Sequence, residues 1–302
     1  MECNWALARK KANLEKRARI LQQVRAFFVG SGLLEVETPC RIPANAPELH
    51  IDAVEADGAV LQSSPELAMK RLLAAGYPDL FQLSRVWRAD ERGSRHLPEF
   101  TLLEWYRRDT GYNALMTDCE ALLAHLVPAG QFNWQGQMID LTPPWPRLTV
   151  SEAFRRFAPC SATEALATGR FDEVLTAEVE PRLGPGPVFL VDYPAPLAAL
   201  ARLKPDDPAL AERVELYLGG LELANGFSEL TDPVEQRARF TADEAARRAA
   251  GKPPCPLPEP YLDELANLAP CAGIALGVDR LVMLLTDARE IGEVVAFTPE
   301  QL

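Results

Sequence analysis

The stretch that decides the fold is residues 81–107, which read FQLSRVWRADERGSRHLPEFTLLEWYR. Both ends of this stretch are apolar or aromatic and its middle is polar, which predicts two strands joined by a loop. Because side chains alternate along a strand, the second strand turns four side chains to one face. These are Phe100, Leu102, Glu104 and Tyr106. The face combines an aromatic ring, a carboxylate and a phenol; the ordinary alternative is a half-buried strand whose glutamate lies in water.

Basic side chains gather around the predicted loop. Arg88 ends the first strand, and the loop carries Arg92, Arg95 and His96. A guanidinium group binds phosphate oxygens in a bidentate manner, and Phe100 offers a ring on which a purine could stack. The cluster predicts a nucleotide site, unless it is a charged hairpin loop on the surface.

Two segments before this hairpin have helical signals. Apolar residues recur at helical spacing over Leu14–Gly30, and an extended segment then ends at Pro39. Ser64-Pro65-Glu66 is typical of a helix start, with a capping hydroxyl, a proline in the first helical position and an early acid.

A third signal lies near the C-terminus, where residues 273–285 read GIALGVDRLVMLL. A short strand is expected to reach Gly277, and a helix to begin directly after it with Arg280 in its first turn. Helix N-termini and arginine both favour anions. An ordinary strand-to-helix turn has the same pattern, so the signal is weak when taken alone.

Residues 221–229, LELANGFSE, carry two glutamates on either side of a turn dipeptide. An unbroken strand would place Glu222 and Glu229 on opposite faces. Asn225-Gly226 favours a tight turn, which would reset the register and let the two carboxylates converge. Converging carboxylates hold Mg²⁺ or an ammonium group; the alternative is a hairpin with two solvated glutamates.

Composition limits the class of protein. The chain has 302 residues, 48% of them hydrophobic, with 31 Lys+Arg against 43 Asp+Glu and a net charge of −12. This indicates a globular α+β protein, and the length with apolar segments throughout predicts one domain over residues 1–302. The acidic balance argues against a surface built for many phosphates. The six cysteines are scattered along the chain and are expected to be buried free thiols. No apolar run is long enough to span a bilayer, and a cytoplasmic protein is therefore expected.

Three of these segments together resemble the class II aminoacyl-tRNA synthetases. The run from Arg88 and Asp90 through His96 and Phe100 to Glu104 is similar to motif 2 of that family. The long helix and extended segment that end at Pro39 resemble motif 1, and the run from Ala275 through Gly277 to Arg280 resembles motif 3. The resemblance covers nearly the whole chain and implies a catalytic core made of an antiparallel sheet flanked by helices.

Within this family, SPE at 64–66, HLPEFT at 96–101, ELANGFSELTD at 222–232 and GVDRL at 277–281 resemble the lysyl subgroup. Only 38 residues precede Pro39, which leaves no room for the OB-fold anticodon domain of lysyl-tRNA synthetases. The chain therefore resembles their stand-alone paralogues, which ligate (R)-β-lysine to a lysine of translation elongation factor P. The resemblance implies ATP and Mg²⁺, a homodimer formed through the motif 1 region, and no need for tRNA.

The resemblance also implies roles for individual residues. Arg88, Arg280 and Glu222 would be catalytic. ATP would be bound by Arg88, Ala89, Asp90, His96, Leu97, Phe100, Glu222, Leu223, Gly277 and Arg280. The amino acid would be bound by Ser64, Pro65, Glu66, Glu104, Tyr106, Glu229 and Ala275, and Mg²⁺ by Glu222 and Glu229.

The chain departs from the family pattern at three positions. Asp90 stands where motif 2 usually has Glu, so Glu91 could share that role. Leu97 stands where the family has Asn, so the contact of the Asn side chain is lost and only the backbone contact remains. Ala275 stands where the family has Gly, and the methyl group of the alanine would favour a β-amino substrate. Three rival functions remain: a minimal lysyl-tRNA synthetase, a ligase for a small-molecule acceptor, and a non-catalytic paralogue. The last would normally have lost one of the charged motif residues.

Overall fold

The computed structural model describes residues 5–302 of the chain. The chain divides into two compact units whose sequences are interleaved. Unit 1 comprises Met1–Arg108, Thr231–Pro270 and Gly277–Leu302, and unit 2 comprises Asp109–Leu230 and Cys271–Leu276. The expectation of one catalytic domain over residues 1–302 stays a prediction.

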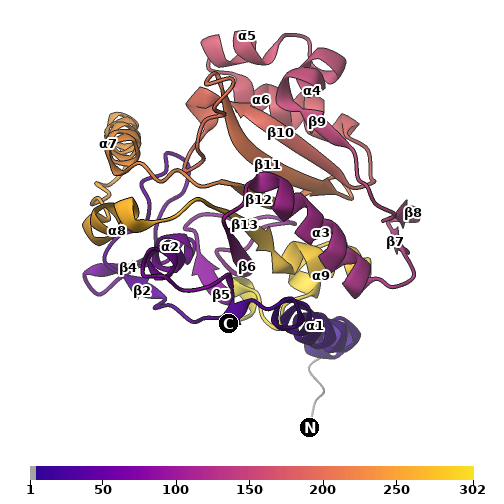
Figure 1. Cartoon of the computed structure of the whole chain (residues 1–302). Coiled ribbons are helices and arrows are strands. Elements are labelled where there is room, and N and C mark those ends of the chain that lie inside the picture. Colours follow the sequence, from indigo (N-terminus) through magenta and orange to yellow (C-terminus); the bar gives the residue numbers. More distant parts are fainter. Residues whose placement is uncertain (1–4) are drawn as a thin grey trace. The chain divides into compact units, whose positions relative to one another are not determined.

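The main strands of unit 1 pair side by side, and β5 and β6 are labelled in Figure 1. β1 (Leu34–Glu35) runs parallel to β5 (Leu80–Trp87), and β5 pairs with β6 (Glu99–Arg108) in antiparallel register. The two strands predicted on either side of the polar loop are therefore confirmed. The other elements of unit 1 are α1 (Trp5–Gly30), β2 (Arg41–Ile42), β3 (Glu55–Ala56), β4 (Ala59–Leu61), α2 (Glu66–Ala74), α7 (Pro233–Ala249), α8 (Glu259–Glu264), α9 (Val278–Thr286), η4 (Leu265–Asn267), η5 (Ile291–Glu293) and η6 (Pro299–Gln301).

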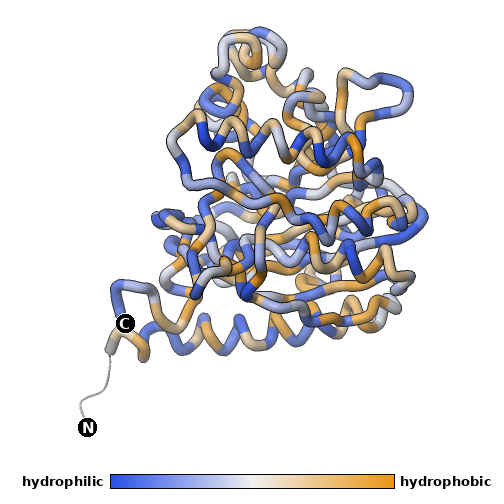
Figure 2. The backbone as a smooth tube through the Cα atoms, turned by 90° about the vertical axis from the view of Figure 1, so that its left-hand side faces the viewer, coloured by the Kyte–Doolittle hydropathy of each residue, from blue (hydrophilic) through white to orange (hydrophobic). Residues whose placement is uncertain are grey.

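Aromatic rings attach α1 to this sheet. The ring of Phe28 lies 5.1 Å from that of Phe81 on β5 and 5.0 Å from that of Trp105 on β6, and all three are buried. Hydrophilic and hydrophobic residues alternate along α1, the helix that follows the grey terminus in Figure 2. α1 also packs against α9, and α9 packs against β6. The predicted helix therefore covers the hairpin and supports the helix that carries Arg280.

Two boundaries in unit 1 differ from the prediction. α1 begins at Trp5 rather than Leu14, because polar contacts and not an apolar stripe hold its first turns. Lys10 Nζ, for example, donates to Gln301 Oε1 at 2.8 Å. α2 begins at Glu66 with Pro65 in the N-cap position, one residue later than predicted, although Ser64 Oγ still accepts the Glu66 N–H at 3.0 Å.

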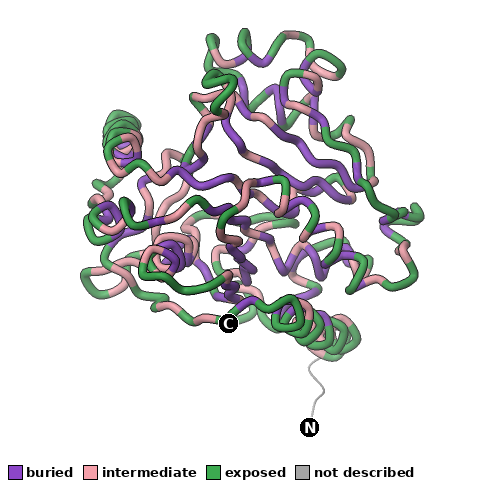
Figure 3. Tube along the Cα trace, in the orientation of Figure 1, coloured by how far each residue is buried: buried purple, intermediate pink, exposed green. Residues whose placement is uncertain are grey.

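Unit 2 contains a five-stranded sheet in the order β13-β12-β11-β10-β9, in which only the β10–β9 pair is parallel. Its buried strands appear as purple segments in Figure 3. α3 packs against β11 and β12, and α4 packs against β10. The elements are α3 (Tyr112–Leu126), β7 (Gln131–Trp134), β8 (Gln137–Asp140), β9 (Arg147–Thr149), α4 (Val150–Phe157), α5 (Ala162–Ala167), α6 (Phe171–Val174), η1 (Leu175–Val179), η2 (Glu180–Arg182), β10 (Val188–Pro194), η3 (Ala195–Leu197), β11 (Leu210–Leu218), β12 (Leu221–Ser228) and β13 (Cys271–Gly277), whose last residue belongs to unit 1.

The turn predicted at Asn225-Gly226 is wrong. Both residues lie inside β12, and the chain reverses instead at Gly219 and Gly220, which both have positive φ. A Cβ atom on Gly226 would come within 2.5 Å of the Ile274 Cβ on β13. The glycine is therefore required by close strand packing, and a dipeptide rule cannot distinguish that need from a turn.

Antiparallel strands with helices against them confirm the predicted α+β class. No helix within residues 5–302 is both long and apolar enough to cross a membrane. The five cysteines in this range are free thiols, but Cys40 is exposed and Cys160 and Cys255 are only partly buried, so the expected burial holds for Cys119 and Cys271 alone. Cys3 lies outside the described residues.

Candidate active site

Arg88 and Phe100 are brought together in unit 1, as the sequence suggested. The guanidinium carbon of Arg88 lies 5.2 Å from the centre of the Phe100 ring. The ring face that was expected to hold a purine is therefore in contact with the arginine in this structure. Arg88 Nε is buried and has no hydrogen-bond acceptor among residues 5–302, which suits a ligand that brings its own oxygens.

The acid beside Arg88 is Glu91 rather than Asp90. Glu91 Oε1 lies 3.5 Å from Arg88 Nη1, whereas Asp90 is exposed and has a φ of +63°. Its short side chain tolerates this left-handed backbone conformation in the turn. The Ala89 N–H, between them, donates to the backbone oxygen of Asp52 at 2.8 Å, which fixes the start of the loop.

His96 and Arg280 form a second contact in unit 1. Arg280 Nη2 lies 2.5 Å from His96 Nε2. Burial lowers the pKa of His96, and the positive charge of Arg280 lowers it further. A neutral His96 can accept the arginine N–H through Nε2, so it orients the guanidinium without adding a charge. A Cβ atom on Gly277, the residue before α9, would lie 3.7 Å from the Arg280 side chain, and Leu97 is buried.

A buried carboxylate lies between the predicted substrate-binding residues of unit 1. Glu104 is 2% exposed; its Oε1 accepts from Ser64 Oγ at 2.5 Å and its Oε2 from Tyr106 OH at 3.2 Å. Ser64 begins the α2 region and follows directly on the buried Ser63, and Pro65 is buried beside it. The alternative of a solvated Glu104 on an ordinary strand is wrong.

Glu66 is paired with a lysine that the sequence reasoning missed. Lys70 Nζ donates to Glu66 Oε1 at 2.5 Å, and the lysine side chain is completely buried. The signal was available, because residues four apart on a helix lie side by side. Burial raises the pKa of Glu104 to about 8, and the negative charge of Glu66 adds to the rise. A buried carboxyl whose pKa is raised in this way is suited to an ammonium group, which would favour its charged form.

In unit 2, a bulge and not a turn sets the register of β12, on which Glu222 lies; Glu229 follows directly after Ser228, the last residue of that strand. The register pairs Phe227, Asn225 and Glu222 with alternate residues of β11, and Leu223 is the extra residue. One inserted residue shifts the alternation, so that Glu222 and Asn225 fall on the same face although they are three residues apart. Leu223 keeps its side chain in the core, which leaves its backbone for any ligand contact. Ala275 on β13 lies opposite Asn225 and shares this face.

The carboxylates of Glu222 and Glu229 suit Mg²⁺ only together with other ligands. Among the residues that the structure describes, no three His, Cys, Asp or Glu side chains form a metal site. Mg²⁺ in nucleotide enzymes uses one or two carboxylates and takes its remaining oxygens from water and phosphates. Glu222, which is partly exposed, and Glu229, which is 2% exposed, are consistent with that need.

Sequence reasoning missed a second buried cluster, on the same face of unit 2. Glu215 of β11 accepts from Arg213 Nη2 at 2.7 Å, Tyr193 OH at 2.5 Å and Tyr217 OH at 2.8 Å. Burial raises the pKa of Tyr193, and the charges around it, Glu215 first, modify it further. The alternation of Arg213, Glu215 and Tyr217 was the only sequence signal, and it has no known motif attached to it.

Three features together indicate the class of protein: the hairpin of β5 and β6, the strand-to-helix step at Gly277, and the clusters of buried polar side chains. The chain matches the family described as tRNA synthetases class II (D, K and N) over residues 4–301, and it belongs to that family. This confirms the class inferred from the three motifs.

Individual relatives are more specific. The chain is similar to proteins named elongation factor P--(R)-beta-lysine ligase from Salmonella gallinarum (strain 287/91 / NCTC 13346), Klebsiella pneumoniae (strain 342) and Salmonella typhi. Each is 39% identical over an alignment of 318 positions that covers 98% of this chain and 98% of the relative.

Proposed function

We propose that this chain is an ATP-dependent ligase that adenylates (R)-β-lysine, or lysine, and transfers it to a lysine side chain of elongation factor P. Full-length similarity to enzymes of that name supports the proposal. The structural observation that carries it is the cluster around Glu104, a buried carboxyl that accepts from the hydroxyls of Ser64 and Tyr106 and lies close enough to Glu66 for that negative charge to raise its pKa. A substrate with a second amino group would bring an ammonium cation to the Glu104 carboxyl.

ATP, which class II synthetases use, is the proposed ligand of the Arg88 and Arg280 side chains. Phe100 is the proposed stacking partner of the adenine, and the other proposed ATP ligands are Ala89, Asp90, His96, Leu97, Leu223 and Gly277. Glu222 and Glu229 are the proposed Mg²⁺ ligands. When bound, the ion would neutralise phosphate charge as the transition state forms.

The amino acid is proposed to bind at Glu66, Glu104 and Tyr106, with Ser64 and Pro65 shaping the pocket and Glu229 as a further carboxylate for an amino group. The Ala275 methyl is proposed to favour a β-amino over an α-amino substrate. Replacing it (Ala275→Gly) should increase the use of L-lysine relative to (R)-β-lysine.

The proposed reaction has two steps. A carboxylate oxygen of the amino acid forms a bond to the α-phosphorus of ATP while the bond to the pyrophosphate oxygen breaks, which gives an acyl-adenylate and pyrophosphate. The neutral ε-amine of the acceptor lysine then attacks the acyl carbon; the bond between this carbon and the anhydride oxygen breaks, AMP leaves with that oxygen, and the new amide nitrogen releases a proton to water. Both steps depend on positioning and charge neutralisation by Arg88 and Arg280, without a protein nucleophile.

Intact-mass analysis of elongation factor P tests the whole proposal. After incubation with this protein, ATP and (R)-β-lysine or L-lysine, the factor should gain the mass of one lysyl residue, and only when ATP is present. A parallel incubation with tRNA should release no extra AMP. A factor of unchanged mass together with aminoacylated tRNA would establish the synthetase alternative instead.

A single substitution tests the nucleotide site. Replacing Arg280 (Arg280→Ala) should abolish ATP–pyrophosphate exchange, because it removes a guanidinium from the phosphates, while the thermal unfolding temperature stays within a few degrees. Arg289→Ala is the matched control, since Arg289 is exposed just beyond the same helix. Normal exchange by the Arg280 variant would contradict the assignment.

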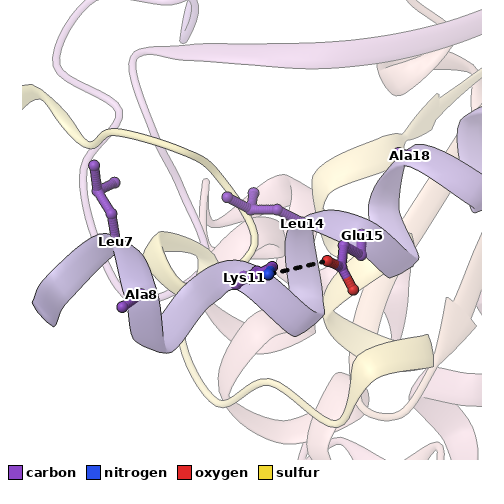
Figure 4. A pocket seen from close by; sticks show the side chains of 6 residues that line it. All are labelled: Leu7, Ala8, Lys11, Leu14, Glu15 and Ala18. Atoms are coloured by element: carbon purple, nitrogen blue, oxygen red, sulfur yellow. Dashed lines mark ion pairs between the residues drawn. The ribbon is translucent and has the colours of Figure 1, made fainter. Parts of the chain in front are cut away.

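The proposed homodimer involves α1. An open groove of about 510 Å³ follows one side of this helix and is lined by Leu7, Ala8, Lys11, Leu14, Glu15 and Ala18 (Figure 4). Lys11 and Glu15 lie 3.9 Å apart along it. A second copy that places its own α1 there would cover the apolar side chains, in agreement with the motif 1 resemblance. Ala18→Glu should convert the dimer to a monomer in sedimentation, and Gln23→Glu, exposed on another side of the same helix, should not. A cytoplasmic location is proposed with this function, because elongation factor P acts in translation.

A further inference from the structure

A buried ion pair connects α1 to the start of α9. Arg17 Nη1 donates to Asp279 Oδ1, and both side chains are largely removed from water, with 13% and 2% exposed. Arg17 Nη1 also reaches the backbone oxygen of Val294 at 3.3 Å. Asp279 lies in the first turn of α9, where the partial positive charge of the helix end adds to that of the guanidinium.

The same pair is bonded to β6 through Thr101. The Thr101 N–H donates to Asp279 Oδ2 at 2.8 Å, and Thr101 Oγ1 accepts from Arg17 Nη2 at 2.9 Å. Arg85 of β5 donates to the same hydroxyl at 3.1 Å. Four elements, α1, α9, β5 and β6, therefore meet at one cluster of hydrogen bonds.

The two residues next to this cluster are those proposed to bind ATP. Asp279 directly precedes Arg280, and Thr101 directly follows Phe100. Holding both Asp279 oxygens fixes the rotation of the first turn of α9, and with it the direction of the next side chain. The Thr101 N–H bond also fixes how far β6 lies from that turn. The ring and the guanidinium are thus set relative to one another by groups that touch neither.

We propose that Arg17 is a positioning residue that, through Asp279 and Thr101, sets Arg280 and Phe100 at the separation that ATP requires. The inference rests on the proposed nucleotide site. A role in stability alone explains the cluster poorly, because a buried ion pair is no more stabilising than well-packed apolar side chains of similar volume. What such a pair adds is a defined geometry, and here that geometry lies between two proposed ligand-binding groups.

Calorimetric titration with a non-hydrolysable ATP analogue tests the proposal without depending on turnover. Arg17→Met should weaken binding at least tenfold, and Arg17→Lys should restore part of the loss, because it keeps the ion pair and loses the bond to Thr101. In pyrophosphate exchange, the KM for ATP should rise more than the KM for the amino acid. Arg25→Met is the matched control, since Arg25 is on the same helix and paired with Glu35 at 2.8 Å, and it should bind ATP within twofold of the unsubstituted protein.

A double variant separates positioning from folding. Arg17→Met leaves Asp279 buried without its cation and should lower the unfolding temperature, which the added change Asp279→Asn should largely restore. The proposal predicts that ATP binding stays weak in the double variant. Recovery of binding together with stability, or unchanged binding by Arg17→Met, would overturn the inference alone. Absence of binding by the unsubstituted protein would overturn the proposed function, and this inference with it.

Discussion

Two buried glutamates, one in each unit, are held in different ways. Glu104 of unit 1 accepts from the hydroxyls of Ser64 and Tyr106. Glu215 of unit 2 accepts from the hydroxyls of Tyr193 and Tyr217 and, in addition, from the guanidinium of Arg213. Glu215 therefore has a directly bonded cation, and a longer contact from Asn225 Nδ2 at 3.4 Å, neither of which has a counterpart at Glu104 within the described residues.

That difference explains what each carboxyl group can do. Arg213 completes the surroundings of Glu215, so this glutamate holds β10 and β11 together and has no need of an external partner. Glu104 has hydroxyl donors but no cation bonded to it, and burial raises its pKa to about 8. A protonated carboxyl in a pocket is ready to exchange its proton for an ammonium group, which is what a substrate provides.

Removing the cation from unit 2 should have the largest effect. Arg213→Met leaves Glu215 buried without its counter-charge and should lower the free energy of unfolding by roughly 3–5 kcal/mol, measured by urea denaturation. Adding Glu215→Gln should recover much of the loss. A single variant as stable as the parent would show that Glu215 needs no cation, and the comparison would fail.

Replacing Glu104 in unit 1 by a side chain that cannot ionise should instead weaken binding of the amino-acid substrate. Glu104→Gln keeps the shape and hydrogen-bonding capacity of the protonated carboxyl, so folding at pH 7 should be improved, because the glutamine does not bear the cost of keeping a proton that the unfolded chain has lost. The KM for the amino acid in pyrophosphate exchange should rise about 10–100-fold, which corresponds to about 1.4–2.7 kcal/mol of lost ammonium binding. Glu99→Gln, an exposed position on the same strand, is the control and should leave the KM unchanged.

The two glutamates also differ in how far the sequence could predict them. Alternation along 99–107 placed Glu104 on a face with Phe100 and Tyr106, because strand periodicity is a local property. Burial of that face depends on Phe28 of α1 and on the α2 region, which are distant in sequence, so the choice between a solvated and a buried Glu104 needed the structure. The Glu215 cluster is assembled from β10 and β11 by pairing that no local pattern specifies.

The same limit explains the two outcomes on β12. The turn that was expected to let Glu222 and Glu229 converge is wrong, and the convergence of the two carboxylates stays a prediction. A bulge has no strong sequence signature, and Gly226 serves the approach of β13 rather than a reversal of the chain. By contrast, the step from a strand to a helix at Gly277 was predicted correctly. The change from a short apolar run to helical spacing lies within one continuous segment, so a local pattern is enough to show it.

The pH dependence of stability should carry the signature of Glu104. Its pKa is raised from 4.5 to about 8 in the folded protein, so the folded state keeps a proton that the unfolded state loses. The stabilisation is fully present below about pH 4.5 and is lost as pH rises towards 8, at up to about 1.4 kcal/mol per pH unit. Urea denaturation across this range should show that slope as a difference between the parent and Glu104→Gln. Parallel curves would mean that Glu104 is already ionised.

The smallest effect should come from removing one phenol hydroxyl at each glutamate. Tyr106→Phe removes a hydrogen bond to a protonated carboxyl and should cost about 0.5–1.5 kcal/mol of unfolding free energy at pH 6. Tyr193→Phe removes a bond to a carboxylate that is paired with a guanidinium, and bonds to charged groups contribute about 1.5–3 kcal/mol. The ratio of the two costs, measured in the same buffer, reports the charge state of each glutamate directly. Equal costs would mean that both carboxyls carry the same charge in the resting protein, so that Glu104 would have no proton to exchange for the ammonium group of a substrate.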